Sequence, residues 1–403
     1  GVVSFEMPAE NVKINLEYYK RVYAYGTGAI CRDGNNELRP GKNITISYTN
    51  QTNHTFIGWA AGSGNGSIIA QSTSFTSSYD DGLRVNKFYA LSCLTASIVA
   101  GVEIDGLQYT IYPGTSRAAV TGLATDNADA TGVEIPESIN YNGETYYVFK
   151  VENNAFQGKT SMRNIKFPTG KQFSIIGEYA FSESGIASAD LSYGVTAIGK
   201  YAFYKCANLI SVDLSKIQYK FTINEYLFAN STNLTTIKLP YLISTISSRA
   251  FENCTSFKGN VTNGNGDVVL DLRGYKLLTT IAGQVFNGCS QITEVYFPLQ
   301  NCSLGDQVTA ACTSLVKIDY GACTANQRGL SSVRDDVSNG KTVNVYIRES
   351  SPAINNAAFN GAYITNLYIE STAVYAQITS ASSLFSTGWN NTSGRITNIF
   401  IRS

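Results

Sequence analysis

One phrase recurs along this chain, and its clearest copy reads Ile198-Gly-Lys-Tyr-Ala-Phe203-Tyr-Lys-Cys206-Ala-Asn-Leu209-Ile-Ser-Val212-Asp-Leu214. The following copy reads Ile223-Asn-Glu-Tyr-Leu-Phe228-Ala-Asn-Ser-Thr-Asn-Leu234-Thr-Thr-Ile237-Lys-Leu239-Pro240. Each copy carries an apolar residue followed by Phe, and then the pattern Leu-x-x-Val/Ile-x-Leu. The fold must therefore be one that many short, similar units build together.

The Phe of each copy marks the period of the repeat. The markers stand at Phe156, Phe181, Phe203, Phe228, Phe251, Phe286, Phe359 and Phe385. The first six are separated by 25, 22, 25, 23 and 35 residues. Thr309 fills the marker position of a unit that has lost its Phe, and a degenerate unit around Val337 closes the remaining gap. This gives about ten units, and a period in the low twenties is typical of leucine-rich repeats.

The apolar spacing within a unit explains why the units must stack. Leu209, Val212 and Leu214 place apolar side chains on one face of a short strand. A single unit cannot bury that face, but neighbours stacked at about 4.8 Å can hide it. We therefore predict a mainly β solenoid with parallel strands on its concave face. The marker Phe and the earlier Ile of each unit should form two further ladders on the convex side.

The consensus Ile-Gly-x-x-Ala-Phe-x-x-Cys-x-x-Leu-x-x-Ile-x-Leu-Pro resembles the BspA-like leucine-rich repeats of bacterial surface proteins. The resemblance covers residues 151–403 unit by unit. Residues 98–150, with Gly106-Leu-Gln-Tyr109 and Tyr141-Asn-Gly143, look like the small β cap that precedes such solenoids. Membership would imply a secreted or surface protein of a host-associated bacterium, with an adhesive role.

Two segments at the start of the chain resemble a different family. Residues 1–19 resemble the end of an internalin-type B-repeat, a small β module of bacterial surface stalks, and residues 20–97 resemble a second, diverged copy. The segment Phe56-Ile-Gly58-Trp59 carries most of this resemblance. We expect Trp59 to anchor the small core of this module.

The composition limits the classes of partner. Among the 403 residues, Lys plus Arg and Asp plus Glu number 30 each, and charged residues make up only 15%. This balance argues against nucleic acid or an anionic membrane as partner. No apolar run approaches the ~18 residues of a membrane helix, so we expect no membrane span. The chain opens at Gly1 in strand-like sequence, so we expect a signal or anchor upstream and an extracellular or cell-surface location.

Four of the eight cysteines belong to the repeat consensus. They stand three residues after a marker, and we expect them to be buried thiols: Cys206, Cys254, Cys289 and Cys312. The other four leave two disulfide pairings open, Cys31 with Cys93 and Cys302 with Cys323.

No metal or cofactor is expected. Zinc is disfavoured because the chain has no Cys-x-x-Cys and a single His. The insertion at 258–267 carries Asn263, Asn265 and Asp267 at alternate positions, but the full calcium-loop pattern is absent. A solvated turn is therefore the preferred interpretation.

The sequence offers little for catalysis. A nucleophile needs a base and an orienting partner, and the single imidazole, His54, lies in a loop-like segment of the N-terminal module. Asp190 and Asp213 occupy the same outward position in successive units and could in principle act as paired glycosidase carboxylates. Like charges one rung apart are more often simply solvated. We therefore expect a non-catalytic protein, with a carbohydrate-active enzyme as the least favoured reading.

The outward positions of the strands predict a binding face. One column reads Lys166, Asp190, Asp213, Lys238, Asp271, Tyr296, Asp319, Tyr346, Tyr368 and Phe400. The other reads Asn164, Ser188, Ser211, Thr236, Val269, Glu294, Lys317, Asn344, Asn366 and Asn398. Charged residues thus give way to aromatics beside asparagines, a composition suited to docking a protein or glycan with little charge.

Seven residues of these columns are the candidate binding residues: Tyr296, Tyr346, Tyr368, Phe400, Asn344, Asn366 and Asn398. The partner would be an extracellular host or bacterial protein or glycan. Two alternatives remain open: the aromatics stack only to stiffen the sheet, or the solenoid is an architectural spacer of a larger surface protein. The last strand, Ile396–Ile401, is also expected to offer an edge for pairing with another chain.

Overall fold

The computed structural model describes residues 87–325 continuously, and then 342–348, 363–370 and 395–402. Within the first part of the chain it describes segments between residues 20 and 78: 20–21, 23–25, 29–32, 37–38, 43–48, 54–61 and 68–78. The expected module of residues 1–19, the degenerate unit around Val337, and the markers Phe359 and Phe385 lie outside these residues. The described elements are almost all strands, with two short 3₁₀ turns at Thr95–Ser97 and Thr125–Asn127.

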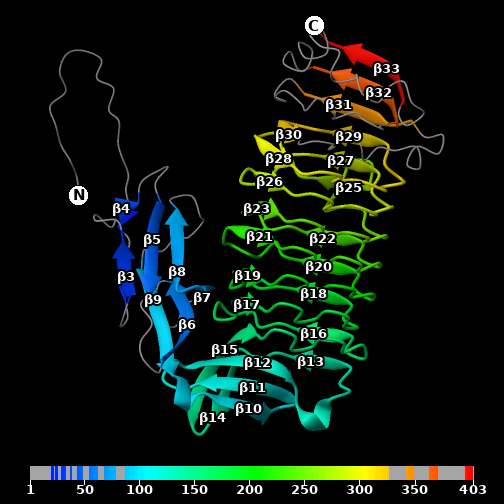
Figure 1. Ribbon diagram of the computed structural model, residues 1–403. Helices are drawn as coiled ribbons and strands as arrows, with labels where there is room; N and C mark the ends of the chain where they lie inside the picture. Colours follow the sequence, from blue (N-terminus) through cyan, green and yellow to red (C-terminus); the bar gives the residue numbers. More distant parts are fainter. Residues whose placement is uncertain are drawn as a thin grey trace, which may run out of the picture.

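The repeats form a solenoid with two parallel stacks of strands (Figure 1). We call the first stack the front sheet. It contains β13 (Gly132–Glu134), β16 (Asn164–Lys166), β18 (Ser188–Asp190), β20 (Ser211–Asp213), β22 (Thr236–Lys238), β25 (Val268–Asp271), β27 (Glu294–Tyr296), β29 (Lys317–Asp319), β31 (Asn344–Ile347), β32 (Tyr363–Ile369) and β33 (Arg395–Ile401). Neighbouring strands pair in parallel, with equivalent residues opposite each other. This hydrogen-bonded pairing is interrupted between β16 and β18 and at the insertion between β22 and β25. The leucine-rich-repeat solenoid predicted from the period is confirmed.

The second stack, the back sheet, consists of short strands that follow the eight-residue β15. It contains β15 (Glu144–Val151), β17 (Ile175–Ile176), β19 (Ala197–Ile198), β21 (Phe221–Ile223), β23 (Ile243–Ile246), β26 (Thr280–Ile281), β28 (Cys302–Leu304) and β30 (Cys323–Ala325). Its Ile residues are buried and form the expected ladder. The sequence did not predict that they would be strands.

The marker Phe side chains form one continuous stack inside the solenoid. Consecutive ring centroids from Phe156 to Phe286 lie 5.2, 5.4, 5.7, 5.2 and 5.4 Å apart, and all six rings are buried. The backbone follows the same order, because each marker amide donates to the carbonyl oxygen just before the next marker, at 2.7–3.0 Å. Phe286 donates to Val308 in this way, so Thr309 occupies the marker position as predicted.

A small β cap leads into this stack. Strands β10 (Val99–Ile104), β11 (Leu107–Tyr112) and β12 (Arg117–Leu123) are antiparallel, and β14 (Ser138–Tyr141) forms a hairpin with β15. Strand β12 then pairs in parallel with β15, and β15 with β17. One hydrophobic core runs without a break from Leu107 to Ile369. The cap therefore covers the apolar end of the first unit.

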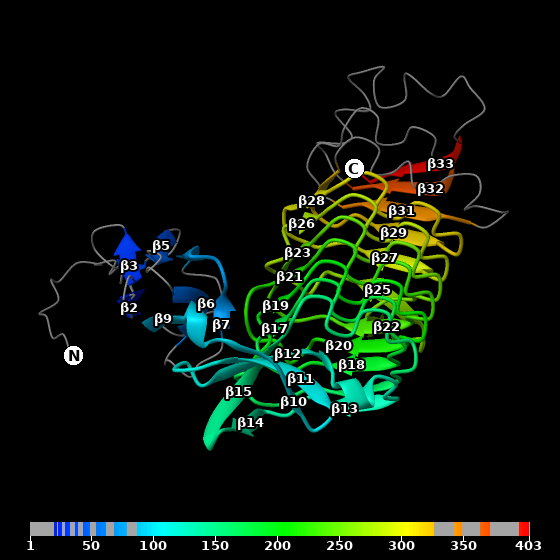
Figure 2. The same ribbon diagram turned by 60° about the horizontal axis from the view of Figure 1, so that its bottom comes forward.

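The N-terminal strands lie beside the base of the solenoid (Figures 1 and 2). They form two small sheets, one of β2 (Tyr23–Tyr25), β9 (Lys87–Leu94), β6 (His54–Ala61) and β7 (Ile68–Ala70), and one of β3 (Ala29–Arg32), β5 (Asn43–Tyr48) and β8 (Ser74–Ser78). A short pair, β1 (Lys20–Arg21) with β4 (Glu37–Leu38), completes them.

Trp59 is fully buried in β6, as predicted for the anchor of this module. The preceding Gly58 lets β7 approach closely, because a Cβ there would lie 2.6 Å from the Ile68 side chain. Strand β7 in turn contacts the solenoid: the Ile68 amide donates to the Ser174 hydroxyl at 3.0 Å, and the Thr196 hydroxyl donates to the Ile68 carbonyl at 2.7 Å. The likeness of this module to a B-repeat stays a prediction.

The consensus cysteines are buried thiols. Each donates its S–H to the carbonyl of an earlier marker Phe, at 3.0–3.2 Å, for Cys206, Cys254, Cys289 and Cys312. Cys302 and Cys323 stand opposite each other on β28 and β30 as buried thiols, and the disulfide left open by the sequence does not join them. The side chains of Cys31 and Cys93 lie outside the described part of the chain.

The insertion forms a hairpin. Strand β24 (Val261–Thr262) pairs antiparallel with β25, and the Asn263 side chain accepts the amides of Asn265 and Asp267 at 2.9 Å each. This is the solvated turn that the sequence favoured. Val269, which was expected to point outward, is instead 2% exposed. That expectation was wrong because Lys258–Asn260 fold across this rung, with the Asn260 amide bonded to the Val269 carbonyl.

We predict that Phe228→Ala lowers the free energy of unfolding by about 3–5 kcal/mol, because it leaves a cavity between two buried rings. Ile210→Ala is the control, since Ile210 is 55% exposed, and should cost about 0.5 kcal/mol or less. Urea unfolding followed by circular dichroism measures both. Equal effects of the two variants would contradict a core built on the Phe stack.

The thiols provide a second test. Burial raises the pKa of Cys206 and of Cys312 to about 12. At pH 8 these groups therefore stay protonated and shielded, and we predict that iodoacetamide leaves them unmodified in the folded protein. In urea without reductant, all six described cysteines should be alkylated, as mass spectrometry of the peptides would report. Modification of Cys302 and Cys323 only after reduction would instead indicate a disulfide.

Candidate binding face

The C-terminal end of the front sheet carries the predicted site. Strands β29, β31, β32 and β33 lie side by side (Figure 1). Their inward residues Ile318, Val345 and Leu367 are buried, which directs the alternate side chains outward. Tyr346, Tyr368 and Phe400 pair in one register column, and Asn344, Asn366 and Asn398 pair in the next. Six of the seven predicted residues therefore come together.

The three aromatic rings form a stack. The Tyr346 and Tyr368 centroids are 4.6 Å apart with planes 6° from parallel, and those of Tyr368 and Phe400 are 4.8 Å apart at 13°. Phe400 is 47% exposed, whereas the two tyrosines are half-buried. In-register parallel strands impose this stack, because their spacing matches the thickness of an aromatic pair. The stack presents a fixed apolar ridge.

An asparagine ladder runs beside the ridge. The Asn366 Nδ2 donates to the Asn344 Oδ1 at 2.8 Å, and the Asn398 Nδ2 donates to the Asn366 Oδ1 at 2.9 Å. Such ladders hold each amide in one orientation. The face thus combines a rigid apolar column with a column of aligned polar groups.

The seventh residue, Tyr296, lies two strands away on β27. Asp319 of β29 separates it from Tyr346 in the column. The Lys317 ammonium group contacts both tyrosine rings: its Nζ lies 4.9 Å from the Tyr296 ring centroid and 5.4 Å from that of Tyr346. The Tyr296 hydroxyl donates to Glu294 and accepts from Lys317. The pKa of Tyr296 is raised, mainly by partial burial of the side chain and secondly by the hydrogen bond to Glu294. Tyr296 therefore belongs to a charged network rather than to the aromatic stack.

Asp319 and Arg348 form the central ion pair of this network. Asp319 is 1% exposed, and the Arg348 Nη2 and Nε donate to its carboxylate at 2.6 and 3.0 Å. The carboxylate raises the pKa of Arg348 well above its usual range. The guanidinium also lies 5.4 Å from the Tyr346 ring centroid, and Glu370 contacts it at 3.5 Å. Arg348 thus holds the first ring of the stack in place.

The N-terminal half of the front sheet has a different surface. Its acids and lysines form exposed ion pairs: Lys166 with Glu134 at 2.6 Å, Lys216 with Asp190 at 2.9 Å, and Lys238 with Asp213 at 2.7 Å. Asp190 and Asp213 therefore each bind a lysine. His54 lies in β6, outside the solenoid.

Among the described residues, no cluster of three or more His, Cys, Asp or Glu side chains could hold a metal ion. No helix in the same part of the chain is both long and apolar enough to cross a membrane.

The repeats can now be compared with known families. The model of the BspA type leucine rich repeat region matches in six copies, over residues 130–263 and 272–387. This chain belongs to that family. The break in the match falls on the insertion hairpin. BspA-type repeats are in general binding modules without enzymatic activity, and membership indicates a binding or adhesion role at an extracellular or surface location.

Several solved structures are similar to this BspA-type chain. A leucine-rich repeat protein of T. pallidum is 23% identical over 53% of this chain and 90% of its own, with a TM-score of 0.43. The pneumococcal vaccine antigen PcpA is 15% identical over 76% of this chain and 99% of its own, with a TM-score of 0.37. A leucine rich cell surface protein of Faecalibacterium prausnitzii is 15% identical over 76% and 95%, with a TM-score of 0.32. A search of curated proteins finds no match.

Lys317 stands in an outward column predicted from the sequence, but the placement of cations over the tyrosine rings of this BspA-type face was not predicted. Arg273, Lys317 and Arg348 each lie over a tyrosine ring. Arg273 and Arg348 each stand three residues after the core residue of their strand, Leu270 and Val345, and this repeated position could have been noticed. The direction in which a long, flexible arginine or lysine side chain points cannot be predicted from its position in the sequence.

We predict that Arg348→Ala lowers the free energy of unfolding by about 3 kcal/mol, because it leaves the buried Asp319 carboxylate without its partner. Lys238→Ala is the matched control: it breaks a front-sheet ion pair whose lysine side chain is 70% exposed, and should change the free energy of unfolding far less. Thermal and urea unfolding of both variants make the comparison. A loss for Arg348→Ala no larger than for Lys238→Ala would contradict a central role for this pair.

Proposed function

We propose that this chain is a non-catalytic adhesion protein, secreted or displayed at the cell surface, that binds an extracellular host or bacterial protein or glycan. The observation that carries the proposal is the rigid stack of Tyr346, Tyr368 and Phe400 beside the asparagine ladder. Aromatic anchors that are already held in place lose little conformational entropy on binding. Residues 1–97 would act as B-repeat-like modules that position the solenoid.

The charges around the ridge also favour a binding role over catalysis. Asp190 and Asp213 each bind a lysine, so neither is available as one of two unpaired acids acting on a glycosidic bond. The ridge itself carries no net charge, and its neighbours Asp319 and Arg348 neutralise each other. A partner with little charge, bound by shape and apolar contact, suits such a surface. Pairing of Ile396–Ile401 with another chain stays a prediction.

The double variant Tyr346→Ala with Tyr368→Ala tests the proposal. Binding of the 403-residue chain to arrays of extracellular-matrix proteins and glycans is measured first, and the affinity for each hit is then determined. We expect the variant to weaken binding by about tenfold or more, as loss of a hot spot does.

A matched control exists on the other side of the solenoid. Tyr179 and Tyr201 form an equivalent stack, with centroids 4.7 Å apart and planes 3° from parallel, in the turns after β17 and β19. Tyr179→Ala with Tyr201→Ala should lose similar stacking energy and leave binding unchanged. Equal affinities of both double variants would contradict the proposal, and an array without any hit would favour the architectural-spacer role.

A further inference from the structure

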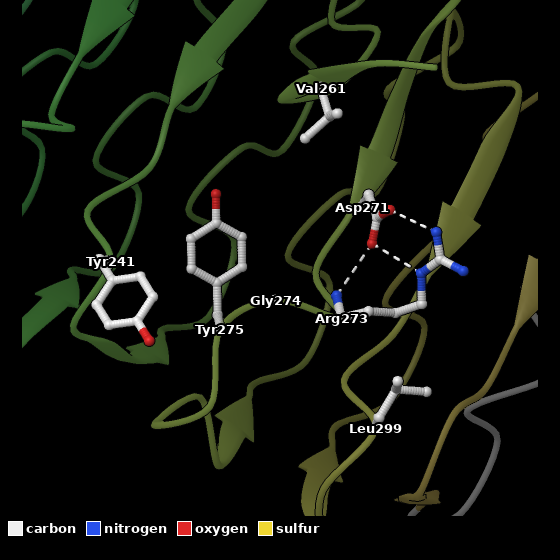
Figure 3. Close-up of a pocket in the computed structure, with 7 residues that line it drawn as sticks. All are labelled: Tyr241, Val261, Asp271, Arg273, Gly274, Tyr275 and Leu299. Atoms are coloured by element: carbon white, nitrogen blue, oxygen red, sulfur yellow. Dashed lines mark hydrogen bonds and ion pairs between the residues drawn. The ribbon is translucent and has the colours of Figure 1, made fainter. Parts of the chain in front are cut away.

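A hollow lies at the edge of the front sheet, separate from the aromatic stack. Parallel strands end at the same edge, so the turns that follow β22, β25 and β27 lie side by side. Their side chains enclose an open-sided hollow of about 630 Å³. Figure 3 shows Tyr241, Val261 and Leu299 on three sides, Tyr275 between them, and the Asp271–Arg273 pair along the remaining side.

The insertion supplies one wall of this hollow. Val261 belongs to β24, the strand that the insertion adds between the regular rungs. The other walls come from ordinary turn positions: Tyr241 and Leu299 each stand three residues after their strand. The insertion hairpin thus gives this hollow a wall that the regular turns among the described residues do not have.

The walls are apolar and accessible. Tyr241 is 65% exposed, Leu299 54% and Val261 42%, which places three of the eight exposed large apolar side chains of the described residues around one hollow. Grouped apolar exposure of this kind marks interaction sites, whereas single exposed apolar residues are ordinary.

The charged groups of the hollow and the Tyr275 hydroxyl already have partners. The Arg273 Nη2 and Nε donate to the two carboxylate oxygens of Asp271 at 2.6 and 3.0 Å, and the Arg273 amide donates to the same carboxylate at 3.0 Å. The Tyr275 hydroxyl accepts from the Asn260 side chain at 3.1 Å. The one acid and one base that line the hollow therefore cancel, and its net charge is zero.

We propose that this hollow is the docking site for one large apolar side chain, such as Trp, Phe or Leu, of a partner polypeptide. A neutral, apolar hollow complements an uncharged apolar group. A saccharide would need several unpaired donors and acceptors, and the Asp271, Arg273 and Tyr275 groups are largely engaged with one another. An anion would meet a guanidinium whose charge Asp271 already neutralises.

A line of side-chain contacts joins the hollow to the aromatic stack. The Arg273 guanidinium lies 4.2 Å from the Tyr296 ring centroid, and Lys317 lies over both Tyr296 and Tyr346. A polypeptide anchored in the hollow would therefore pass along this line of side chains toward the stack. The inference rests on the proposed binding function and narrows its partner to a protein.

The experiment uses N-acetyl-L-tryptophanamide as the probe, with methyl α-D-glucoside as the saccharide comparison, on the full chain. Saturation-transfer NMR titrations give the dissociation constants. We expect the tryptophan amide to bind weakly and the glucoside not at all. Val261→Asp and Leu299→Asp should each weaken the binding of the tryptophan amide by about tenfold or more, because they place a charge in an apolar site.

Tyr193→Asp is the matched control, since Tyr193 is 43% exposed at the same turn position as Tyr241, two units earlier, and should leave the probe's affinity unchanged. The inference would be overturned if the tryptophan amide did not bind, or if Val261→Asp bound it as tightly as the unsubstituted chain does. It would also be overturned if the unsubstituted chain bound the glucoside and Val261→Asp did not, which would indicate a saccharide site. A dimer that sedimentation detects and that Val261→Asp dissociates would indicate a second copy of this chain as the occupant. The variant Tyr346→Ala with Tyr368→Ala should still bind the probe. If the double variant keeps both its affinity for the tryptophan amide and its affinity for the array hits, the proposed role of the aromatic stack is contradicted, whereas the proposed role of the hollow is not.

Discussion

The structure depends on one contact repeated from unit to unit: a buried Phe ring stacked on the next, with its backbone amide bonded to the carbonyl ahead of the following marker. A unit of some twenty residues cannot bury its own apolar face, so each depends on its neighbours. This coupling fixes the rise and register of every strand at once. At Thr309 a unit has lost its Phe, yet the Phe286 amide still donates to the Val308 carbonyl and β29 still pairs with β27 and β31.

The same constraint decides what the sequence could predict. Because equivalent residues stand opposite each other, the spacing of the Leu and Ile positions was enough to place Tyr346, Tyr368 and Phe400 in one column and the three asparagines in another. The back-sheet strands were not foreseen, because the repeat marks them with little more than one Ile, whereas the Leu-x-x-Val/Ile-x-Leu pattern shows the alternation of the front strand. Val269 was misplaced because the insertion covers its rung, and Arg348 was missed because the sequence does not fix the direction of a long side chain.

The two ends of the front sheet have different surface chemistry. Toward the cap, lysines and acids alternate in exposed pairs that contribute little to stability. Toward the C-terminus, aromatic rings and amides follow one another, with the buried Asp319–Arg348 pair at the boundary. The insertion hairpin creates the apolar hollow next to this boundary. The features suited to recognition therefore lie together, while the rest of the solenoid serves as a rigid support.

Hydrogen exchange at single-residue resolution, measured by mass spectrometry with electron-transfer fragmentation, tests the central claim most directly. If the units are held by the marker contacts, the amides of Phe181, Phe203, Phe228, Phe251 and Phe286 should be among the slowest to exchange. Their protection should be similar, because each donates the same bond to its neighbour. Exchange at these amides as fast as at the tip of the insertion hairpin would contradict the account.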